Sequence, residues 1–445
     1  MKTEYRFLHL SDIHFGQERS GNLVTHEDAR EMLIRDAAAL RNTLGSADGI
    51  VVTGDSAYSG SHEEYKAAGS FLERLATAVG CEPIAVRVIP GNHDVDRQKI
   101  NRFCALAHER VRNCDETQVE QALAELLSEE EDGNPLFPKL SEYREFARRF
   151  GCDFESAKKS RWTRDIKLGQ QYSLRLLGMN TAHICDANDR IGNIVLGNMQ
   201  YVFTPEDDVA VMALIHHPTS WLIDRPNAER YLKRAAIVLC GHEHSLEIRK
   251  VSFDDGSEQL QIFAGAVNPP EGSADYPYRY NWMNVRLSGE ARSRCIGVEV
   301  WPRVWNYSST AYAADTMRLN GNESCLFEIA CPTFTEEKET QDGDVPDVTE
   351  GHTTEDVPMP PDEDLNFERL KYYIWTYLDW QERLAIFVSL GLLPDSETQP
   401  MAQALEQLAI TSARSRGLLD ELWDLVMNHV PEDKRLENPY GHTEE

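Results

Sequence analysis

The chain has 445 residues, of which 41% are hydrophobic and 27% are charged, which is typical of a globular protein with two domains or one large domain and an appendage. Its formal net charge is −29, from 74 acidic and 45 basic residues, which argues against nonspecific coating of nucleic acid without excluding a nuclease. The nine Cys form no C-x-x-C pair, so a zinc ribbon is unsupported, and neither a secretory signal nor an apolar span of ~20 residues is visible. Scattered Cys suit a reducing compartment, so we expect a cytoplasmic protein without a membrane partner.

Through residue 301, short apolar runs of strand length alternate with turns rich in Asp, Gly, Asn or His. Their near-continuous apolarity predicts strands buried on both faces, as in a layered α/β core. The last two runs alternate in polarity, which favours antiparallel strands that close the sheet system. The predicted strands are 7–10, 50–53, 85–89, 174–179, 209–215, 236–240, 261–266, 282–287 and 296–301.

Helices are expected between some of these strands. The segment 25–44 begins with Thr-x-x-Asp, and 61–79 begins with Ser-x-Glu-Glu, which resembles a capping box. From 96 to about 169 the pattern of apolar runs and turns is replaced by charged stretches that look helical, at 118–131 and 140–150. We interpret 96–169 as a helical insertion between core strands, acting as a lid or as a wall.

The chain after residue 332 divides into a linker, a small domain and a tail. Residues 335–365 carry twelve acidic residues, one Lys and four Pro, so 333–365 is predicted to be an acidic disordered linker. Residues 366–432 are dense in Leu, Trp, Tyr and Ile at helical spacing, which predicts a small helical domain. Asp379 is the expected N-cap of one helix, Gly391 its end, and 417–430 another helix. Residues 1–332 would form the large domain and 433–445 a tail.

Five polar motifs follow the predicted strands, four of them directly. In a layered α/β fold, loops at the carboxyl ends of strands gather at one edge of the sheet. The five motifs therefore predict a single cleft that collects Asp, Asn and His side chains. They are Asp12-Ile13-His14, Gly54-Asp55, Gly91-Asn92-His93-Asp94, His216-His217-Pro218 and Gly241-His242-Glu243-His244.

These residue types suit a two-metal site. Two divalent ions roughly 3.5–4 Å apart need a bridging carboxylate and a mixed shell of nitrogen and oxygen ligands. A water between the ions becomes a hydroxide nucleophile near neutral pH, and a protonated His can donate a proton to the leaving oxygen. The alternative is ordinary turn chemistry, because Asp, Asn and Gly are common after strands. Five motifs in order, with none of the ligands missing, favour the metal site.

The ordered set D-x-H, G-D, G-N-H-D, H-x-P and G-H-x-H resembles the calcineurin-like metallophosphoesterase family over roughly residues 4–303. The resemblance implies a four-layer sandwich of two mixed β-sheets flanked by helices, and two divalent ions. Manganese is the favoured metal, with iron, zinc, magnesium and nickel as alternatives. One ion would be held by Asp12, His14, Asp55 and His244, and the other by Asp55, Asn92, His216 and His242, with Asp55 bridging.

The same resemblance assigns the proton donor. His93 would contact the phosphate and act as general acid, and Asp94 would orient it. Many relatives have an apolar residue after the bridging Asp, whereas this chain has Ser56-Ala57-Tyr58. Tyr58 could line the cleft or pack inside the domain. For His217, a role beside the metals or toward the substrate and a structural role are both open.

The tail has a resemblance of its own. It is carried by Leu390-Gly391-Leu392-Leu393, Ala413-Arg414-Ser415-Arg416-Gly417-Leu418-Leu419 and Leu422-Trp423. This pattern is similar to the effector-associated adaptor domains of bacterial conflict systems. Those domains are small, helical, death-domain-like modules that recruit an effector to a partner with a matching module. The resemblance implies a protein partner that binds through residues 366–432.

Together these features predict an enzyme, a metal-dependent phosphoesterase that cleaves phosphodiester bonds by a metal-bridging hydroxide. We expect a nuclease or nucleotide phosphodiesterase that acts as an effector, recruited by its tail, in bacterial antiphage defence. The opening Leu10-Ser11-Asp12-Ile13-His14 and the His-His-Pro motif resemble cyclic-nucleotide phosphodiesterases and repair nucleases more than phosphoprotein phosphatases. The alternatives are a cyclic-nucleotide or other small-molecule phosphodiesterase or phosphatase, a phosphoprotein phosphatase, and a non-catalytic scaffold.

Overall fold

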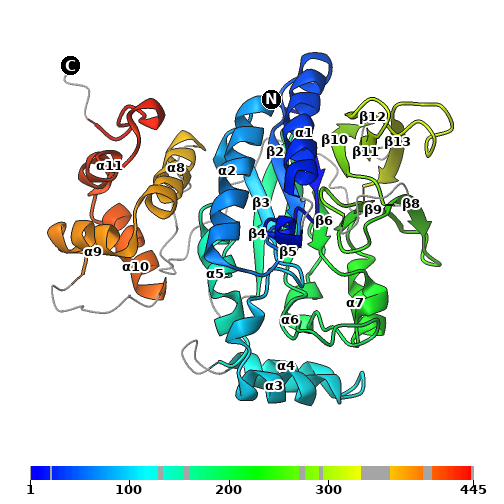
Figure 1. The fold of residues 1–445 in the computed structure, drawn as a ribbon, viewed down its shortest axis with the longest axis horizontal. Helices are drawn as coiled ribbons and strands as arrows, with labels where there is room; N and C mark the ends of the chain where they lie inside the picture. Colours follow the sequence, from blue (N-terminus) through cyan, green and yellow to red (C-terminus); the bar gives the residue numbers. More distant parts are fainter. Residues whose placement is uncertain are drawn as a thin grey trace, which may run out of the picture. The chain divides into compact units, whose positions relative to one another are not determined.

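A computed structural model describes residues 2–20, 23–128, 134–154, 160–269, 276–289, 294–331, 361–393 and 403–441. The chain forms two compact units, Met1–Phe334 and Thr335–Glu445, which are described separately (Figure 1). The insertion and the cleft expected from the motifs both belong to the first unit.

The first sheet of this unit is mixed. Its order is β12-β11-β10-β1-β2-β3, with β13 paired to β11; β1, β2 and β3 run parallel and the other pairs are antiparallel. Every residue of β2 is buried, as its apolar sequence predicts. The strands are β1 (Glu4–Leu10), β2 (Gly49–Thr53), β3 (Val86–Ile89), β10 (Arg279–Ser288), β11 (Cys295–Asn306), β12 (Ala311–Ala314) and β13 (Cys325–Ala330).

The second sheet has the order β4-β5-β6-β7-β9-β8. Its inner strands β5, β6, β7 and β9 run parallel, and the edge strands β4 and β8 are antiparallel to their neighbours. The sequence did not predict these edge strands, because charged residues interrupt their apolar positions and most of their side chains are at least partly exposed. The strands are β4 (Arg161–Leu168), β5 (Tyr172–Met179), β6 (Val209–Ile215), β7 (Ile237–Cys240), β8 (Leu246–Ser252) and β9 (Glu258–Ala264).

Helices complete the layers around the sheets. Helix α1 (Leu23–Leu44) packs against α2 (His62–Val79), and α2 also contacts α5 (Ser141–Arg148). Ser61 is the N-cap of α2 and forms a capping box with Glu64, as its sequence predicts. The two mixed sheets with their flanking helices confirm the predicted sandwich (Figure 1).

The insertion has a small core of its own. Residues 161–168 of the segment predicted as a helical insertion instead form β4, because they pair with β5 at the edge of the second sheet. The part before β4 contains α3 (Arg102–Arg112), α4 (Val119–Ser128), η5 (Pro138–Leu140) and α5, and Figure 1 shows α3 and α4 together at one end of the unit. The helices predicted at 118–131 and 140–150 correspond to α4 and α5, whereas α3 was not predicted. Val111, Leu123 and Phe137 pack together with Ile184 and Val195 from outside the insertion. The insertion is therefore joined to the segment that follows β5.

The remaining elements of the first unit are short. They are η1 (Gln17–Ser20), η2 (Pro83–Ala85), η3 (Arg97–Lys99), η6 (Thr219–Trp221), α6 (Asn198–Tyr201) and α7 (Arg225–Leu232).

The second unit contains α8 (Pro361–Tyr377), α9 (Trp380–Ser389), α10 (Gln403–Ser415), α11 (Leu419–Met427) and η8 (Glu432–Lys434). Asp379 caps α9 by accepting hydrogen bonds from two backbone N–H groups, and Gly391 has φ 61° just after this helix, as predicted. Trp375, Phe387 and Trp423 are in its core. Helix α8 begins at Pro361, inside the predicted linker, and residues 333–360 lie outside the described part of the chain. Across the described helices, no segment combines the length and the apolarity needed to cross a membrane.

Candidate metal centre

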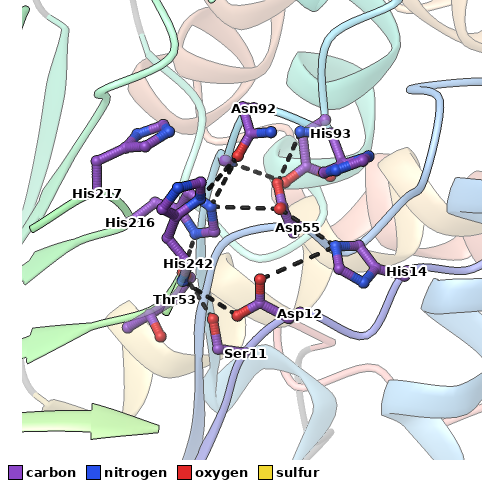
Figure 2. Close-up of polar contacts among 12 residues, drawn as sticks. Ser11, Asp12, His14, Thr53, Asp55, Asn92, His93, His216, His217 and His242 are labelled. Carbon is purple, nitrogen blue, oxygen red and sulfur yellow. Dashed lines mark hydrogen bonds and ion pairs between the residues drawn. The ribbon is translucent and has the colours of Figure 1, made fainter. Parts of the chain in front are cut away.

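The five polar motifs meet where strands of the two sheets end (Figure 2). Asp12, Asp55, His216 and His242 follow β1, β2, β6 and β7 within two residues, and Asn92 follows β3. Asp12, His14, Asp55 and His242 have φ values of 53°, 50°, 55° and 65°. This left-handed conformation is uncommon for residues other than Gly, and such strain tends to gather at functional sites.

The carboxylate of Asp55 lies at the middle of the cluster. Its Oδ2 is 3.2 Å from Nε2 of His14 and 3.3 Å from Nε2 of His216, which lie in loops that follow strands of different sheets. Its Oδ1 accepts a hydrogen bond of 2.8 Å from the backbone N–H of His93. One carboxylate oxygen is thus shared by imidazoles on either side, which is the arrangement that a bridging ligand requires.

Two further groups of donor atoms lie on opposite sides of Asp55. On one side, Oδ1 of Asp12 is 3.3 Å from Nε2 of His244 and 3.9 Å from Nε2 of His14. On the other side, Oδ1 of Asn92 is 3.2 Å from Nε2 of His216 and 3.1 Å from Nδ1 of His242.

The atoms in these two groups fit divalent metal ions. Asp12 Oδ1 is buried without a hydrogen-bond partner among the described residues. Oxygen and imidazole donors of Asp12, His14 and His244 all lie within 4.8 Å of one another, and so do those of Asp12, Asp55 and His216. Carboxylate, amide and imidazole donors suit first-row transition metals.

Backbone carbonyls orient two of the imidazoles. Nδ1–H of His14 donates to the carbonyl of Asn268 at 3.1 Å, and Nδ1–H of His216 donates to the carbonyl of Thr53 at 2.8 Å. Each bond turns Nε2 of the ring toward Asp55, as outer partners of metal ligands commonly do. The sequence motifs contain no sign of these carbonyls, because every residue carries one.

His93 is held differently from the arrangement expected. Its Nδ1–H donates to the carbonyl of Tyr58 at 2.9 Å, and its ring stacks on the Tyr58 ring with centroids 4.9 Å apart. The carboxylate of Asp94 instead accepts backbone N–H groups of Ala57 and Gly91 at 3.0 Å, besides the hydroxyl of Tyr65. The expectation that Asp94 orients the His93 ring is therefore corrected, because that ring is oriented by Tyr58.

The structure places His217 beside the ligands, with a ring nitrogen within 4.8 Å of donor atoms of His216 and His242. It is fully buried, and its Nδ1 shares a hydrogen bond of 2.7 Å with Oγ1 of Thr181. Its ring lies against His242 at 4.5 Å between centroids, and Trp221 meets His242 edge to face at 4.2 Å. The motifs did not identify Trp221; the only signal was its place four residues after His217.

Burial and neighbouring charges together set the pKa values of the cluster. Burial opposes ionisation of Asp12 and Asp55, but the surrounding histidines more than offset it and hold the pKa of each carboxyl below its usual range. Burial lowers the pKa of His216, but Asp55 outweighs it and raises that pKa to about 9. Burial and the charge of His216 lower the pKa of His242 to about 3. A protonated imidazole must lose its proton to bind a metal, so metal affinity should rise with pH.

Comparisons with solved structures find matches at low identity and low TM-score. A predicted phosphoesterase from Streptococcus pneumoniae is 12% identical, with 74% of this chain and 99% of that chain covered and a TM-score of 0.27. The NAD nucleotidase of Haemophilus influenzae is 10% identical (71% and 54% covered, TM-score 0.32). A purple acid phosphatase from yellow lupin is 13% identical (76% and 58% covered, TM-score 0.36), so this chain spans little more than half of the last two proteins. A search of curated proteins finds no match.

Two family models match separate parts of the chain. The model of the GTPase-associated adaptor domain matches residues 366–428, which confirms the adaptor resemblance of the tail. The model of the calcineurin-like phosphoesterases matches residues 5–246, more than half of the chain, and spans all five motifs. The chain therefore belongs to the calcineurin-like phosphoesterase family.

Proposed function

We propose that this protein hydrolyses phosphodiester bonds in nucleic acid or nucleotides at a centre of two divalent ions. The observation that carries the proposal is the shared oxygen of Asp55, 3.2 Å from His14 and 3.3 Å from His216. One ion would be held by Asp12, His14, Asp55 and His244, and the other by Asp55, Asn92, His216 and His242.

The ions, when bound, supply Lewis acidity that activates water for attack and neutralises charge on the phosphoryl oxygens. Side chains of the protein protonate and contact the leaving group. His93, fixed by the Tyr58 carbonyl, presents Nε2 as the proton donor to the leaving oxygen. Tyr58 is 37% exposed and lies flat on His93, so its outer face is available to the leaving group. Manganese is the metal we favour for this mixed set of carboxylate, amide and imidazole donors, with iron, zinc, magnesium and nickel as alternatives.

The adaptor domain supports a role as a recruited effector. We propose that residues 366–432 bind a protein partner with a matching module and thereby bring the phosphoesterase to its substrate, in antiphage defence. The domain has a continuous core around Leu370, Phe387 and Trp423, which suits a module that binds as a folded unit.

A substrate panel with Mn²⁺ tests the proposal. It compares single- and double-stranded DNA and RNA, cyclic nucleotides, phosphomonoesters and phosphoproteins, with bis-p-nitrophenyl phosphate as a general diester and Asp55→Ala as the inactive control. We expect hydrolysis of diesters in preference to monoesters. Hydrolysis of cyclic nucleotides without polymers would select the small-molecule alternative. Activity on monoesters or phosphoproteins alone would contradict the proposal.

A further inference from the structure

One segment of the chain lies between the helical insertion and one half of the metal centre. Residues 180–195, the supporting segment, follow β5. Ile184 and Val195 from this segment are buried in the core of the insertion. Other residues of the segment bind His217 and Trp221, whose rings lie against the ligand His242, so the segment contacts both regions.

The insertion holds the supporting segment by buried charges. The guanidinium of Arg112, on α3, donates to Asp186 at 2.8 Å and to both Asp189 and the carbonyl of Ile184 at 2.7 Å. His108, also on α3, donates through Nδ1–H to the same Asp186 oxygen at 2.8 Å. Nζ of Lys139 donates to Nε2 of His108 at 2.7 Å and to a carbonyl of the segment at 3.0 Å. Breaking such a buried ion pair leaves a charge unpaired and is strongly destabilising locally.

The supporting segment in turn holds Trp221. The backbone N–H groups of Gly192 and Ile194 both donate to the carbonyl of Trp221, at 3.1 and 3.0 Å. The N–H of Ile223 donates back to the carbonyl of Ile194 at 2.7 Å. The main chain on both sides of the Trp221 ring is therefore tied to the segment.

The same segment also holds His217, because Thr181 provides the hydrogen bond to its Nδ1. Trp221 and His217 lie against His242, with ring centroids at 4.2 and 4.5 Å. The ligands on the far side of Asp55 are held from elsewhere, since His14 is oriented by Asn268. Support that passes from Arg112 through the supporting segment therefore reaches the His242 side of the centre.

We infer that Trp221 and His217 are positioning residues for His242, and that the insertion, through Arg112, supports the ion held by Asn92, His216 and His242. The insertion then acts as a wall rather than a lid. Loss of its contact with the supporting segment weakens the binding of one ion selectively. This inference rests on the two-ion centre proposed above. It assigns Arg112, which lies on the insertion, a measurable effect on metal binding.

Calorimetric titration of the metal-free full-length protein with Mn²⁺ tests the inference. Arg112→Lys keeps the charge but loses the forked contact with Asp186 and Asp189. We expect one of the two binding steps to weaken by about 10- to 100-fold, the usual effect of removing an outer partner of a ligand, and the other to stay unchanged. The affected step is identified in two backgrounds. His14→Ala and Asn92→Ala should each retain one of the two ions. Adding Arg112→Lys should weaken the binding of the remaining ion in the His14→Ala protein but not in the Asn92→Ala protein.

A matched control comes from Arg303, which makes a similar forked pair with Asp36 at 2.8 and 2.6 Å. Arg303→Lys should leave both binding steps unchanged. Equal weakening of both steps in Arg112→Lys, no weakening, or the same selective loss in Arg303→Lys would overturn the inference. If Arg112→Lys does not fold, Trp221→Leu decides instead, by loss of the same step or by unchanged binding, with Trp221→Phe expected to restore it.

The two proposals fail separately. Suppose that the wild-type protein binds two ions and hydrolyses no diester, while Arg112→Lys weakens one binding step selectively. This result contradicts the proposed function and supports this inference. A wild-type protein that hydrolyses bis-p-nitrophenyl phosphate while Arg112→Lys binds both ions normally does the reverse.

Discussion

Replacing Gly91 by Ala should disable the metal centre through a single methyl group. The φ of Gly91 is outside the left-handed region, so an Ala backbone is compatible with this position. The added Cβ, however, would lie 2.7 Å from Cγ of Asp55 and 2.7 Å from Nε2 of His216, whereas ordinary contact begins at 3.4 Å. His216 must therefore retreat by about 0.7 Å, and Asp55 by more, because its Oδ1 would lie nearer to the added Cβ than either of these atoms. Both ligands are buried, with exposures of 1% for Asp55 and 0% for His216.

A displacement of this size is large for a metal site, where ligand distances tolerate only about 0.2 Å. We expect Gly91→Ala to retain fewer than two ions and to lose at least about 100-fold in turnover, since a 1 Å misplacement costs about that much. Overpacking should lower the free energy of unfolding by about 1–3 kcal/mol. Metal analysis after dialysis, hydrolysis of bis-p-nitrophenyl phosphate and denaturant unfolding measure the three effects.

Gly69→Ala is the control for this substitution. The added Cβ would meet only the end of the Arg149 side chain, at 3.1 Å, within helix α2. This variant should keep both ions and wild-type turnover. A Gly91→Ala protein with two ions and normal turnover would refute the reasoning, because it would mean that Asp55 and His216 need not occupy these positions.

Further substitutions test other parts of the structure. Asp55→Ala should abolish both metal retention and activity in the same assays, because both ions share this ligand. His93→Ala should keep two ions and slow turnover by about 10²–10⁴-fold, most for poor leaving groups, and loss of the metals would contradict its role as proton donor. Burial and the charge of Lys139 lower the pKa of His108 to about 3, from 6.5 in the unfolded chain. The unfolded state thus binds a proton that the folded state does not, and stability falls as the pH drops from 6.5 toward 3, by up to about 1.4 kcal/mol per pH unit. His108→Gln should make the pH dependence of denaturant unfolding shallower over this window, and an unchanged slope would contradict the shift. Deleting residues 366–445 should spare hydrolysis of the small diester and remove partner binding. An inactive truncated protein would contradict the view that the two units work independently.

The strands that the sequence predicts well are those whose burial is nearly complete. β2 is buried along its whole length, and its apolar run is continuous. The edge strands β4 and β8 have one exposed side, so charged residues hide the pattern. Helix α3 was missed for a related reason, because Phe103 and Leu106 are 75% and 51% exposed and blur its apolar face.

The composition of the candidate site is readable from the sequence, because metal binding depends on side-chain types and those occur in short motifs after strands. The sequence alone therefore determines which carboxylates and imidazoles are available, and with them the chemistry that we propose. Only the tertiary structure decides which atoms share a neighbour, such as Oδ2 of Asp55, and which carbonyls turn each ring. The carbonyl of Tyr58 and the ring of Trp221 take part because the fold brings them within contact of His93 and His242. Contacts between residues far apart in the chain depend on packing, which local sequence does not encode.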